Sequence, residues 1–282
     1  MKILKKIDEV RGEINRVKKE NKIIGFVPTM GYLHKGHVSL IKKAKEECDY
    51  IVVSIFVNPT QFCPGEDFDR YPRDIERDIK ILENEKVDLL FNPDIDEIYK
   101  KEHKTWIIVD EISDIYEGKF RPGHFKGVCT VVIKLFNIIE PDKAYFGLKD
   151  FQQFIIIKKM VDDLNIPVEI VGCPTIREDD GLAASSRNIY LNEVERKKAL
   201  CLYKALRKVE RMIKEENIFD CEILIKEGRK IIENEEGVEI QYLDVVNMDN
   251  MKRIKRIEGK VVIIGAIKIG NVRLIDNLIV SI

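Results

Sequence analysis

Residues 23–37 read IIGFVPTMGYLHKGH. The apolar run Ile23–Val27 is typical of a buried strand, and the ten residues after it include two glycines. They lead into His37–Cys48, where apolar residues recur at helical spacing. A strand, a glycine-containing loop and a helix in this order are typical of a βαβ unit in a parallel sheet.

The same alternation continues to about residue 175. Strand-like runs are predicted at Ile23–Val27, Tyr50–Phe56, Val87–Phe91, Thr105–Val109, Lys143–Phe146 and Val168–Val171. Helices are predicted at His37–Cys48, Arg73–Glu85, Phe125–Ile139 and Phe151–Leu164. Apolar strands separated by helices predict a doubly wound α/β domain with a parallel sheet covered on both faces. We assign this domain to residues 1–175.

The pattern changes after Pro174. Two long charged helices are predicted at Glu193–Asn217 and Asp220–Glu235, followed by strands at Glu239–Val246, Lys260–Ile269 and Val272–Val280. Gly270-Asn271, between the last two strands, is typical of a two-residue hairpin. Residues 176–282 are therefore expected to form a smaller α+β domain with an antiparallel sheet, joined to the first domain near Cys173–Asp180.

Composition excludes several classes of protein. With 48 Lys and Arg against 49 Asp and Glu, the net charge of -1 gives no general attraction to nucleic acid or to an acidic membrane. No apolar run approaches the ~20 residues that span a bilayer, and Met1–Glu13 contains no signal-peptide core. The six cysteines are too widely spaced for a CxxC pair. We expect a soluble cytoplasmic protein with reduced cysteines.

The loop Pro28–His37 is the first candidate for chemistry, because ligands of open parallel sheets bind beyond the carboxyl ends of the strands. It resembles the frame of a P-loop, but His37 and Val38 replace the expected Lys and Ser/Thr, which argues against a Walker A site. His34 and His37 share one face of a first helical turn and suit a phosphate there. A zinc pair and two incidental surface histidines are the alternatives.

Other loops carry candidates too. Asn58 and Gln61 follow the second strand, and their amides suit a small polar substrate, although Asn-Pro also starts turns. Arg121–Gly127 places cationic side chains at a helix start and could serve a triphosphate, or its Pro and Gly only mark the turn.

Two later segments suit phosphate as well. Lys149 can neutralise phosphate charge, and Asp150 can orient a metal ion or a hydroxyl group, unless both are solvated charges beside a helix cap. Arg177–Asn188 has the composition of a mobile loop that could close over a phosphate chain, or of a plain linker.

Several blocks, taken together and in order, resemble the pantothenate synthetases, a family of pantoate-β-alanine ligases. The blocks are Pro28–His37, Phe56–Phe62, Tyr71–Arg73, Arg121–Gly127, Phe146–Gln153 and Gly181–Asn188. The resemblance runs from residue 23 to residue 191, and residues 34–37 are similar to the HxGH element of the wider nucleotidyltransferase superfamily. The resemblance implies a Rossmann-like first domain that binds ATP and pantoate, a second domain that acts as a lid, a homodimer, and Mg2+ with ATP.

The resemblance also implies roles for individual residues. Those implied to bind ATP are Met30, Gly31, Tyr32, Leu33, His34, Lys35, Gly36, His37, Gly147, Leu148, Lys149, Asp150, Ile176, Ala184, Ser185, Ser186 and Arg187. Those implied to be catalytic are His37, His34, Lys149, Ser186 and Arg187. Gln61 is expected to bind pantoate and β-alanine, Gln153 to bind pantoate, and Asp78 or Asp150 to lie near Mg2+.

The sequence departs from the family at two positions. Leu148 stands where an acidic residue is common, and Ala184 where methionine is common. The implied reaction joins pantoate to β-alanine through a pantoyl adenylate, with release of pyrophosphate and AMP. Two rival functions stay open at this point: a nucleotidyltransferase that leaves the nucleotide on its product, and a nucleotide-binding regulatory module without turnover.

Overall fold

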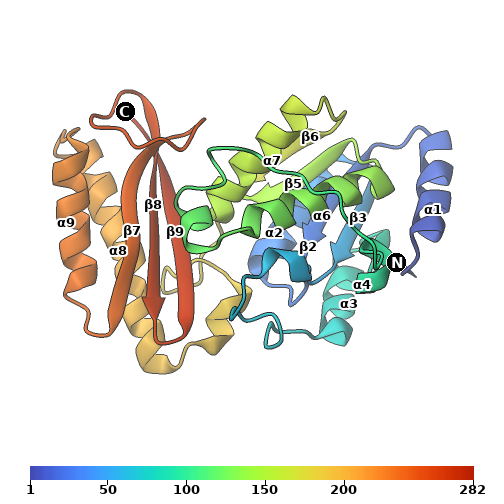
Figure 1. Ribbon diagram of the computed structural model, residues 1–282, viewed down its shortest axis with the longest axis horizontal. Helices are drawn as coiled ribbons and strands as arrows, with labels where there is room; N and C mark the ends of the chain where they lie inside the picture. The colour runs from blue at the N-terminus through green and yellow to red at the C-terminus, as the bar shows by residue number, and fades with distance from the viewer. The chain divides into compact units, whose positions relative to one another are not determined.

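The computed structural model describes residues 1–282, and the chain forms two compact units (Figure 1). Unit 1 consists of Met1–Leu148 and Gln153–Thr175. Unit 2 consists of Ile176–Ile282 together with Lys149–Gln152. Unit 2 thus includes a short stretch whose chain neighbours on both sides belong to unit 1.

Unit 1 is built on a parallel sheet of six strands. The strands are β1 (Lys2–Leu4), β2 (Ile24–Thr29), β3 (Tyr50–Ile55), β4 (Leu89–Phe91), β5 (Lys143–Gly147) and β6 (Glu169–Cys173). Their order is β1-β4-β3-β2-β5-β6, and every neighbouring pair is parallel. The predicted doubly wound sheet is confirmed. Successive strands build outward from β2 on one side and from β5 on the other, and ligands of such sheets bind where the order switches.

Helices cover both faces of this sheet. They are α1 (Ile7–Lys19), α2 (Lys35–Glu47), α3 (Ile75–Asn84), α4 (Ile95–Ile98), α5 (Glu117–Phe120), α6 (His124–Ile139) and α7 (Phe151–Asp163), with short 3-10 helices η1 (Pro59–Gln61) and η2 (Leu148–Asp150). Adjacent side chains of a strand point to opposite faces. Val27 clusters with Leu40 of α2, whereas the ring of Phe26 contacts the ring of Phe136 of α6 at 6.3 Å. α2 and α6 therefore lie on opposite faces.

Two sequence predictions need correction in unit 1. The sequence patterns used above do not predict β1 or α1. The three residues of β1 are too few to show a strand period, whereas α1 carries Val10, Ile14 and Val17 at helical spacing, a signal that could have identified it. The strand predicted at Thr105–Val109 is wrong, because this stretch joins neither sheet. β4, the strand that precedes it, already pairs with β1 on one side and β3 on the other, so it offers no open edge.

Unit 2 has the predicted antiparallel sheet with helices against it (Figure 1). Its strands are β7 (Val238–Asn247), β8 (Lys260–Ile269) and β9 (Val272–Ser281), and its helices are α8 (Glu193–Lys214), α9 (Cys221–Glu233) and the 3-10 helix η3 (Ser186–Tyr190). Apolar side chains of α8, α9 and the sheet, such as Leu206, Leu224 and Ile263, share one core. Ile269 pairs with Val272 across Gly270-Asn271, which confirms the hairpin.

All six cysteines are free thiols. None of the helices is both long enough and apolar enough to cross a lipid bilayer.

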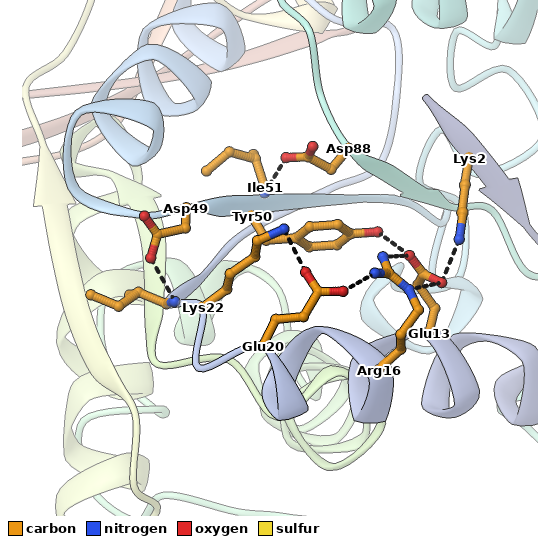
Figure 2. Close-up of polar contacts among 10 residues, drawn as sticks. Lys2, Glu13, Arg16, Glu20, Lys22, Asp49, Tyr50, Ile51 and Asp88 are labelled. Atoms are coloured by element: carbon orange, nitrogen blue, oxygen red, sulfur yellow. Dashed lines mark hydrogen bonds and ion pairs between the residues drawn. The ribbon is translucent and has the colours of Figure 1, made fainter.

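A buried glutamate fastens α1 to the sheet (Figure 2). Glu13 is 8% exposed and accepts hydrogen bonds from Lys2 Nζ of β1 (2.5 Å), Arg16 Nη2 of its own helix (2.7 Å) and the Tyr50 hydroxyl of β3 (2.9 Å). These donors, Arg16 first, lower the pKa of Glu13 to about 2 despite its burial. The carboxylate therefore stays charged at neutral pH and joins three elements.

We predict that Glu13→Gln lowers the free energy of unfolding near pH 7 by about 2–3 kcal/mol, because a pKa shift of this size is worth roughly 3 kcal/mol. The depressed pKa means that this stabilisation is complete above the ordinary pKa of 4.5 and is lost as the pH falls toward 2. The difference from wild type should therefore shrink across that range. Urea unfolding at several pH values measures it.

Glu9→Gln, at an exposed position of the same helix, is the matched control and should change stability little at any pH. A Glu13→Gln deficit of the same size at neutral and at acid pH would contradict the prediction.

Candidate active site

The loop after β2 is held by a buried carboxylate. Asp78, in the first turn of α3, is 1% exposed, and its two oxygens accept hydrogen bonds from the backbone N–H groups of Tyr32 (2.6 Å) and Leu33 (2.7 Å). Burial raises the pKa of Asp78, and the two N–H donors oppose that shift. Gly31 has a φ of +82°, and a Cβ there would lie 2.9 Å from an Ile55 methyl carbon. The loop therefore needs glycine at this position.

The neighbouring arginine of α3 holds the same loop. Arg77 Nη2 donates to the Leu33 carbonyl at 2.8 Å, and its guanidinium carbon lies 4.8 Å from the centre of the Tyr32 ring. Tyr32 has a φ of +49°, an uncommon value for a residue with a side chain. Two consecutive residues of α3 thus keep the backbone of residues 31–33 in one conformation.

The two histidines stand side by side where α2 begins. His34 is the N-cap residue, and its Nδ1 accepts a hydrogen bond from the Gly36 N–H at 3.1 Å. Nδ1 of His37 accepts one from the His34 N–H at 3.3 Å, and the ring centroids are 4.0 Å apart. Because an accepting Nδ1 carries no proton, a neutral ring has its N–H at Nε2. Two imidazole donors beside a helix N-terminus favour an anionic ligand such as phosphate.

Gln61, at the end of η1, lies next to the loop after β2. Its Nε2 is 3.1 Å from Met30 Sδ, and its Oε1 accepts a hydrogen bond from Asn58 Nδ2 at 3.0 Å. Asn58 is 1% exposed and also donates to the Gly127 carbonyl. The Asn58 amide therefore fixes which way the Gln61 amide faces. The structure brings Met30 and Gln61, two predicted site residues, into contact.

The stretch Arg121–Gly127 has a different arrangement from the one suggested by its sequence. His124 is 6% exposed, and burial lowers its pKa to about 4, so the ring is neutral near pH 7. Its Nδ1 lies 2.7 Å from the Gln61 carbonyl oxygen and donates to it, while Nε2 accepts from Arg121 Nη1 at 3.1 Å. Arg121 also forms a two-fold ion pair with Glu66. These side chains hold the backbone of Gln61 instead of presenting positive charge.

The residues after β5 are divided between the units. Gly147 and Leu148 belong to unit 1, whereas Lys149 and Asp150 belong to unit 2. Leu148 packs over Gly172 of β6, where an added Cβ would be 2.8 Å from a Leu148 methyl carbon. The Leu148 side chain thus occupies the space beside Gly172. The Lys149 side chain is 18% exposed, with its Nζ 3.7 Å from an oxygen of the half-exposed Asp150.

In unit 2 the stretch from Ile176 to Arg187 contains local hydrogen bonds and the start of a short 3-10 helix. The Ala184 N–H donates to the Ile176 carbonyl at 2.9 Å, and η3 begins at Ser186, with the Ser185 hydroxyl accepting from the Arg187 N–H. Ala184 is 3% exposed and Ser186 is 7% exposed. The predicted ATP-binding residues Ala184–Arg187 therefore lie in a defined turn.

The two metal candidates differ in their surroundings. Both oxygens of Asp78 already accept backbone hydrogen bonds, whereas the Asp150 carboxylate is 47% exposed beside Lys149. No group of three or more His, Cys, Asp or Glu side chains is arranged to hold a metal ion. The remaining predicted site residues are Lys35, the first residue of α2, and Gln153, in the first turn of α7.

The family model described as pantoate-beta-alanine ligase matches residues 2–279. The chain belongs to this family. The resemblance found in the sequence blocks is thereby confirmed, and the match extends beyond residues 23–191 to nearly the whole of both units.

Relatives of similar length support the assignment. A pantothenate synthetase of Caldicellulosiruptor bescii is 51% identical over 281 residues, which cover 100% of this chain and 99% of the relative. The crystal structure of pantothenate synthetase from Thermus thermophilus is 42% identical, with a TM-score of 0.94 and 99% of each chain covered. A pantoate-beta-alanine ligase from Francisella tularensis, complexed with beta-gamma ATP and beta-alanine, is 40% identical, with a TM-score of 0.81 and 99% and 97% covered.

Gly127 is required by the close approach of α6 to η1. A Cβ at Gly127 would lie 2.2 Å from the Thr60 carbonyl oxygen and 2.6 Å from the Gln61 nitrogen, both backbone atoms. We predict that Gly127→Ala destabilises the protein by at least about 2 kcal/mol, because backbone must move to admit the methyl group. Thermal and urea unfolding measure this loss.

Gly12→Ala is the matched control, since Gly12 is also helical but a Cβ there has no atom within 4 Å. It should be neutral or stabilising by up to about 1 kcal/mol, the difference in helix propensity. Equal effects of the two substitutions would show that the close approach does not constrain residue 127.

Proposed function

We propose that this chain condenses pantoate with β-alanine at the expense of ATP, forming pantothenate, AMP and pyrophosphate. The observation that carries the proposal is the pair of imidazoles 4.0 Å apart at the start of α2, in a chain that matches the ligase family from residue 2 to residue 279. The beta-gamma ATP and beta-alanine named for the Francisella tularensis protein support the choice of ATP and β-alanine as substrates.

The first step activates the acid. A pantoate carboxylate oxygen attacks the α-phosphorus of ATP, the new O–P bond forms, and the bond to the β-phosphate oxygen breaks, releasing pyrophosphate. The carboxylate is already a nucleophile, so the protein contributes placement and charge stabilisation. In unit 1, Nε2–H groups of His34 and His37 donate to phosphate oxygens. In unit 2, Lys149, Ser186 and Arg187 offset the negative charge of the leaving group.

The second step forms the product. The free amine of β-alanine attacks the acyl carbon of pantoyl adenylate, the C–N bond forms, the C–O bond to AMP breaks, and the nitrogen loses a proton. Gln61 contacts both acids, and its amide direction, set by Asn58, supports this role. Gln153 contacts pantoate. The mixed anhydride is easily hydrolysed, so the reaction needs water excluded from it.

Magnesium enters this scheme as Mg-ATP, the substrate. Mg2+ is commonly bound by one or two carboxylates together with substrate phosphates. The exposed carboxylate of Asp150 fits that pattern better than Asp78, whose oxygens hold the loop after β2. The cytoplasmic location and the lid role of residues 176–282 stay predictions.

The active form is a homodimer in this proposal, and a stretch of unit 1 that lies outside both sheets supports it. Between Lys104 and Asp110 the backbone of unit 1 joins no sheet, and the Ile108 side chain is 63% exposed. An antiparallel pairing of two copies centred on Ile107 would place Lys104 of one copy opposite Asp110 of the other. Opposite charges at both ends and apolar residues in the middle favour such a pair.

The proposed reaction is tested by pyrophosphate exchange. With pantoate and ATP but no β-alanine, labelled pyrophosphate should enter ATP, because the first step is reversible and needs only the acid. Adding β-alanine should then release AMP, with label from a pantoate carboxyl oxygen in its phosphate. Exchange without pantoate, or a product that retains the nucleotide, would instead favour the rival nucleotidyltransferase.

We predict that His37→Ala slows the exchange by about 10²- to 10³-fold, the usual effect of removing one donor to a developing charge. Circular dichroism should stay near that of the wild type, and the free energy of unfolding should fall by only about 1 kcal/mol, the usual cost of a lost helix-cap bond. Lys42→Ala, at an exposed position of the same helix, is the control and should exchange at the wild-type rate. Wild-type turnover by His37→Ala would remove this histidine from the mechanism.

We also predict that Ile108→Lys converts the dimer into a monomer, with the mass by light scattering falling from twice 32.8 kDa to 32.8 kDa. Two lysines near the centre of the interface would repel each other and would leave apolar surface uncovered. Leu164→Lys, at another exposed apolar residue, should remain dimeric.

The charged residues at the two ends of the same interface allow a charge-reversal test. Lys104→Glu should weaken the dimer, and adding Asp110→Lys should restore it. A wild-type monomer, or a dimer indifferent to both Ile108→Lys and Lys104→Glu, would refute this interface.

A further inference from the structure

A side chain near the C-terminus holds the lysine predicted to bind phosphate. Asn277 Nδ2, on β9, donates to the backbone carbonyl of Lys149 at 2.8 Å, across 128 positions of the chain. Lys149–Gln152 belongs to unit 2 although the residues before and after it belong to unit 1. The Asn277 hydrogen bond joins this stretch to the sheet of unit 2.

The residue beside it forms a buried ion pair. Asp276 is 5% exposed, and its oxygens accept hydrogen bonds from Arg177 Nη1 (2.6 Å) and Nη2 (2.9 Å). The Arg177 guanidinium carbon lies 3.8 Å from the centre of the Tyr203 ring. Burial raises the pKa of Asp276, and the charges of Arg177 and, more weakly, Lys149 oppose this. Asp276, on β9, thus fixes the direction of the Arg177 guanidinium.

Arg177 connects this cluster to the second predicted ATP-binding stretch of unit 2. Its backbone forms an antiparallel bridge with Ala183, and its Nη1 donates to the Gly181 carbonyl at 3.1 Å. The turn that results brings the Ala184 N–H to the Ile176 carbonyl. One cluster on β9 thus holds Lys149 through Asn277 and the turn before Ala184–Arg187 through Asp276.

We propose that Asp276 and Asn277 are positioning residues for adenylation, which keep Lys149 and the Ala184–Arg187 stretch in fixed register within unit 2. The inference rests on the proposed function, because it assigns the cluster to the phosphate-binding groups of that reaction. A buried ion pair is weak evidence of a contribution to stability, since its desolvation offsets its attraction. Holding two binding segments in one geometry is a role that such a pair serves well, because the chemistry depends on placement.

The test uses pyrophosphate exchange by the full-length protein with pantoate. Asn277→Ala should lower the maximal exchange rate by about 10- to 100-fold, because a misplaced charged group loses most of its effect. The KM for pantoate should change less than about twofold, since Gln61 and Gln153 belong to unit 1 and do not depend on the cluster.

Val280→Ala separates positioning from stability. Val280 is fully buried on the same strand, and its truncation lowers the melting temperature without touching Lys149 or Arg177. We expect it to exchange at the wild-type rate below its melting temperature. If Val280→Ala and Asn277→Ala reduce the rate equally at equal loss of stability, Asn277 is merely structural and the proposal is wrong.

A double-mutant cycle tests whether Asn277 affects the exchange rate through Lys149. In a Lys149→Ala background the Asn277 contact has no ammonium left to position, so adding Asn277→Ala should cost less than about threefold. The same fold loss in both backgrounds would overturn the proposal. Asn277→Asp, which keeps the size of the side chain and replaces the donor with an acceptor, should reproduce the kinetics if Asn277→Ala fails to fold.

Asp276→Asn tests the other arm, because it removes the charge opposite Arg177 while keeping the shape. It should raise the KM for ATP several-fold and leave the KM for pantoate unchanged, and equal changes in both constants would count against the proposal. If the wild-type protein shows no pantoate-dependent exchange, both the proposed function and this inference are wrong. If the wild-type protein shows the exchange, and Asn277→Ala and Asp276→Asn have the same kinetic constants as the wild type, only this inference is wrong.

Discussion

The buried carboxylate of Asp78 is the interaction on which the geometry of unit 1 depends. It accepts the N–H groups of Tyr32 and Leu33, which follow the central strand β2 and immediately precede the histidine pair. Because these two N–H groups are bonded, the backbone dihedral angles of Tyr32 and Leu33 can vary little. The position of His34, the next residue, is therefore well defined. Leaving either N–H buried without an acceptor would cost about 1–3 kcal/mol. The loop therefore keeps its conformation for two reasons: it forms these hydrogen bonds, and any other conformation would leave a buried N–H group without an acceptor.

The sequence predicts the architecture well where a hydrophobic pattern continues over many residues. It predicts poorly where a short segment becomes a strand only if a neighbouring strand is there to pair with it. The alternation of apolar runs with helical spacing gives the parallel sheet, the antiparallel sheet and the β8–β9 hairpin. It also predicts a strand at Thr105–Val109, because a run of β-branched and aromatic residues has the composition of a strand whether or not another strand lies beside it. β1 escapes detection because its three residues are too few to show a period.

The candidate site divides in the same way. The position of His34 beside His37 follows from their spacing on a first helical turn. The roles of Asp78 and His124 do not, because each depends on a partner that is 45 or 63 positions away in the chain. Nothing in the local sequence distinguishes a cationic histidine from one that burial keeps neutral. Charged residues near a predicted site thus need their ion partners known before they are assigned to a ligand, as Arg121 with Glu66 illustrates.

The division of the chain into units has a consequence for how the protein can be taken apart. The polypeptide passes from one unit to the other after Leu148, after Gln152 and after Thr175. A cut at the last of these points would give a C-terminal fragment without the four residues that contain the acceptor for Asn277. Unit 2 is therefore not a single continuous stretch of the chain. A chimaera that replaces residues 176–282 with those of a relative must also replace residues 149–152, because otherwise the two parts of unit 2 would come from different proteins.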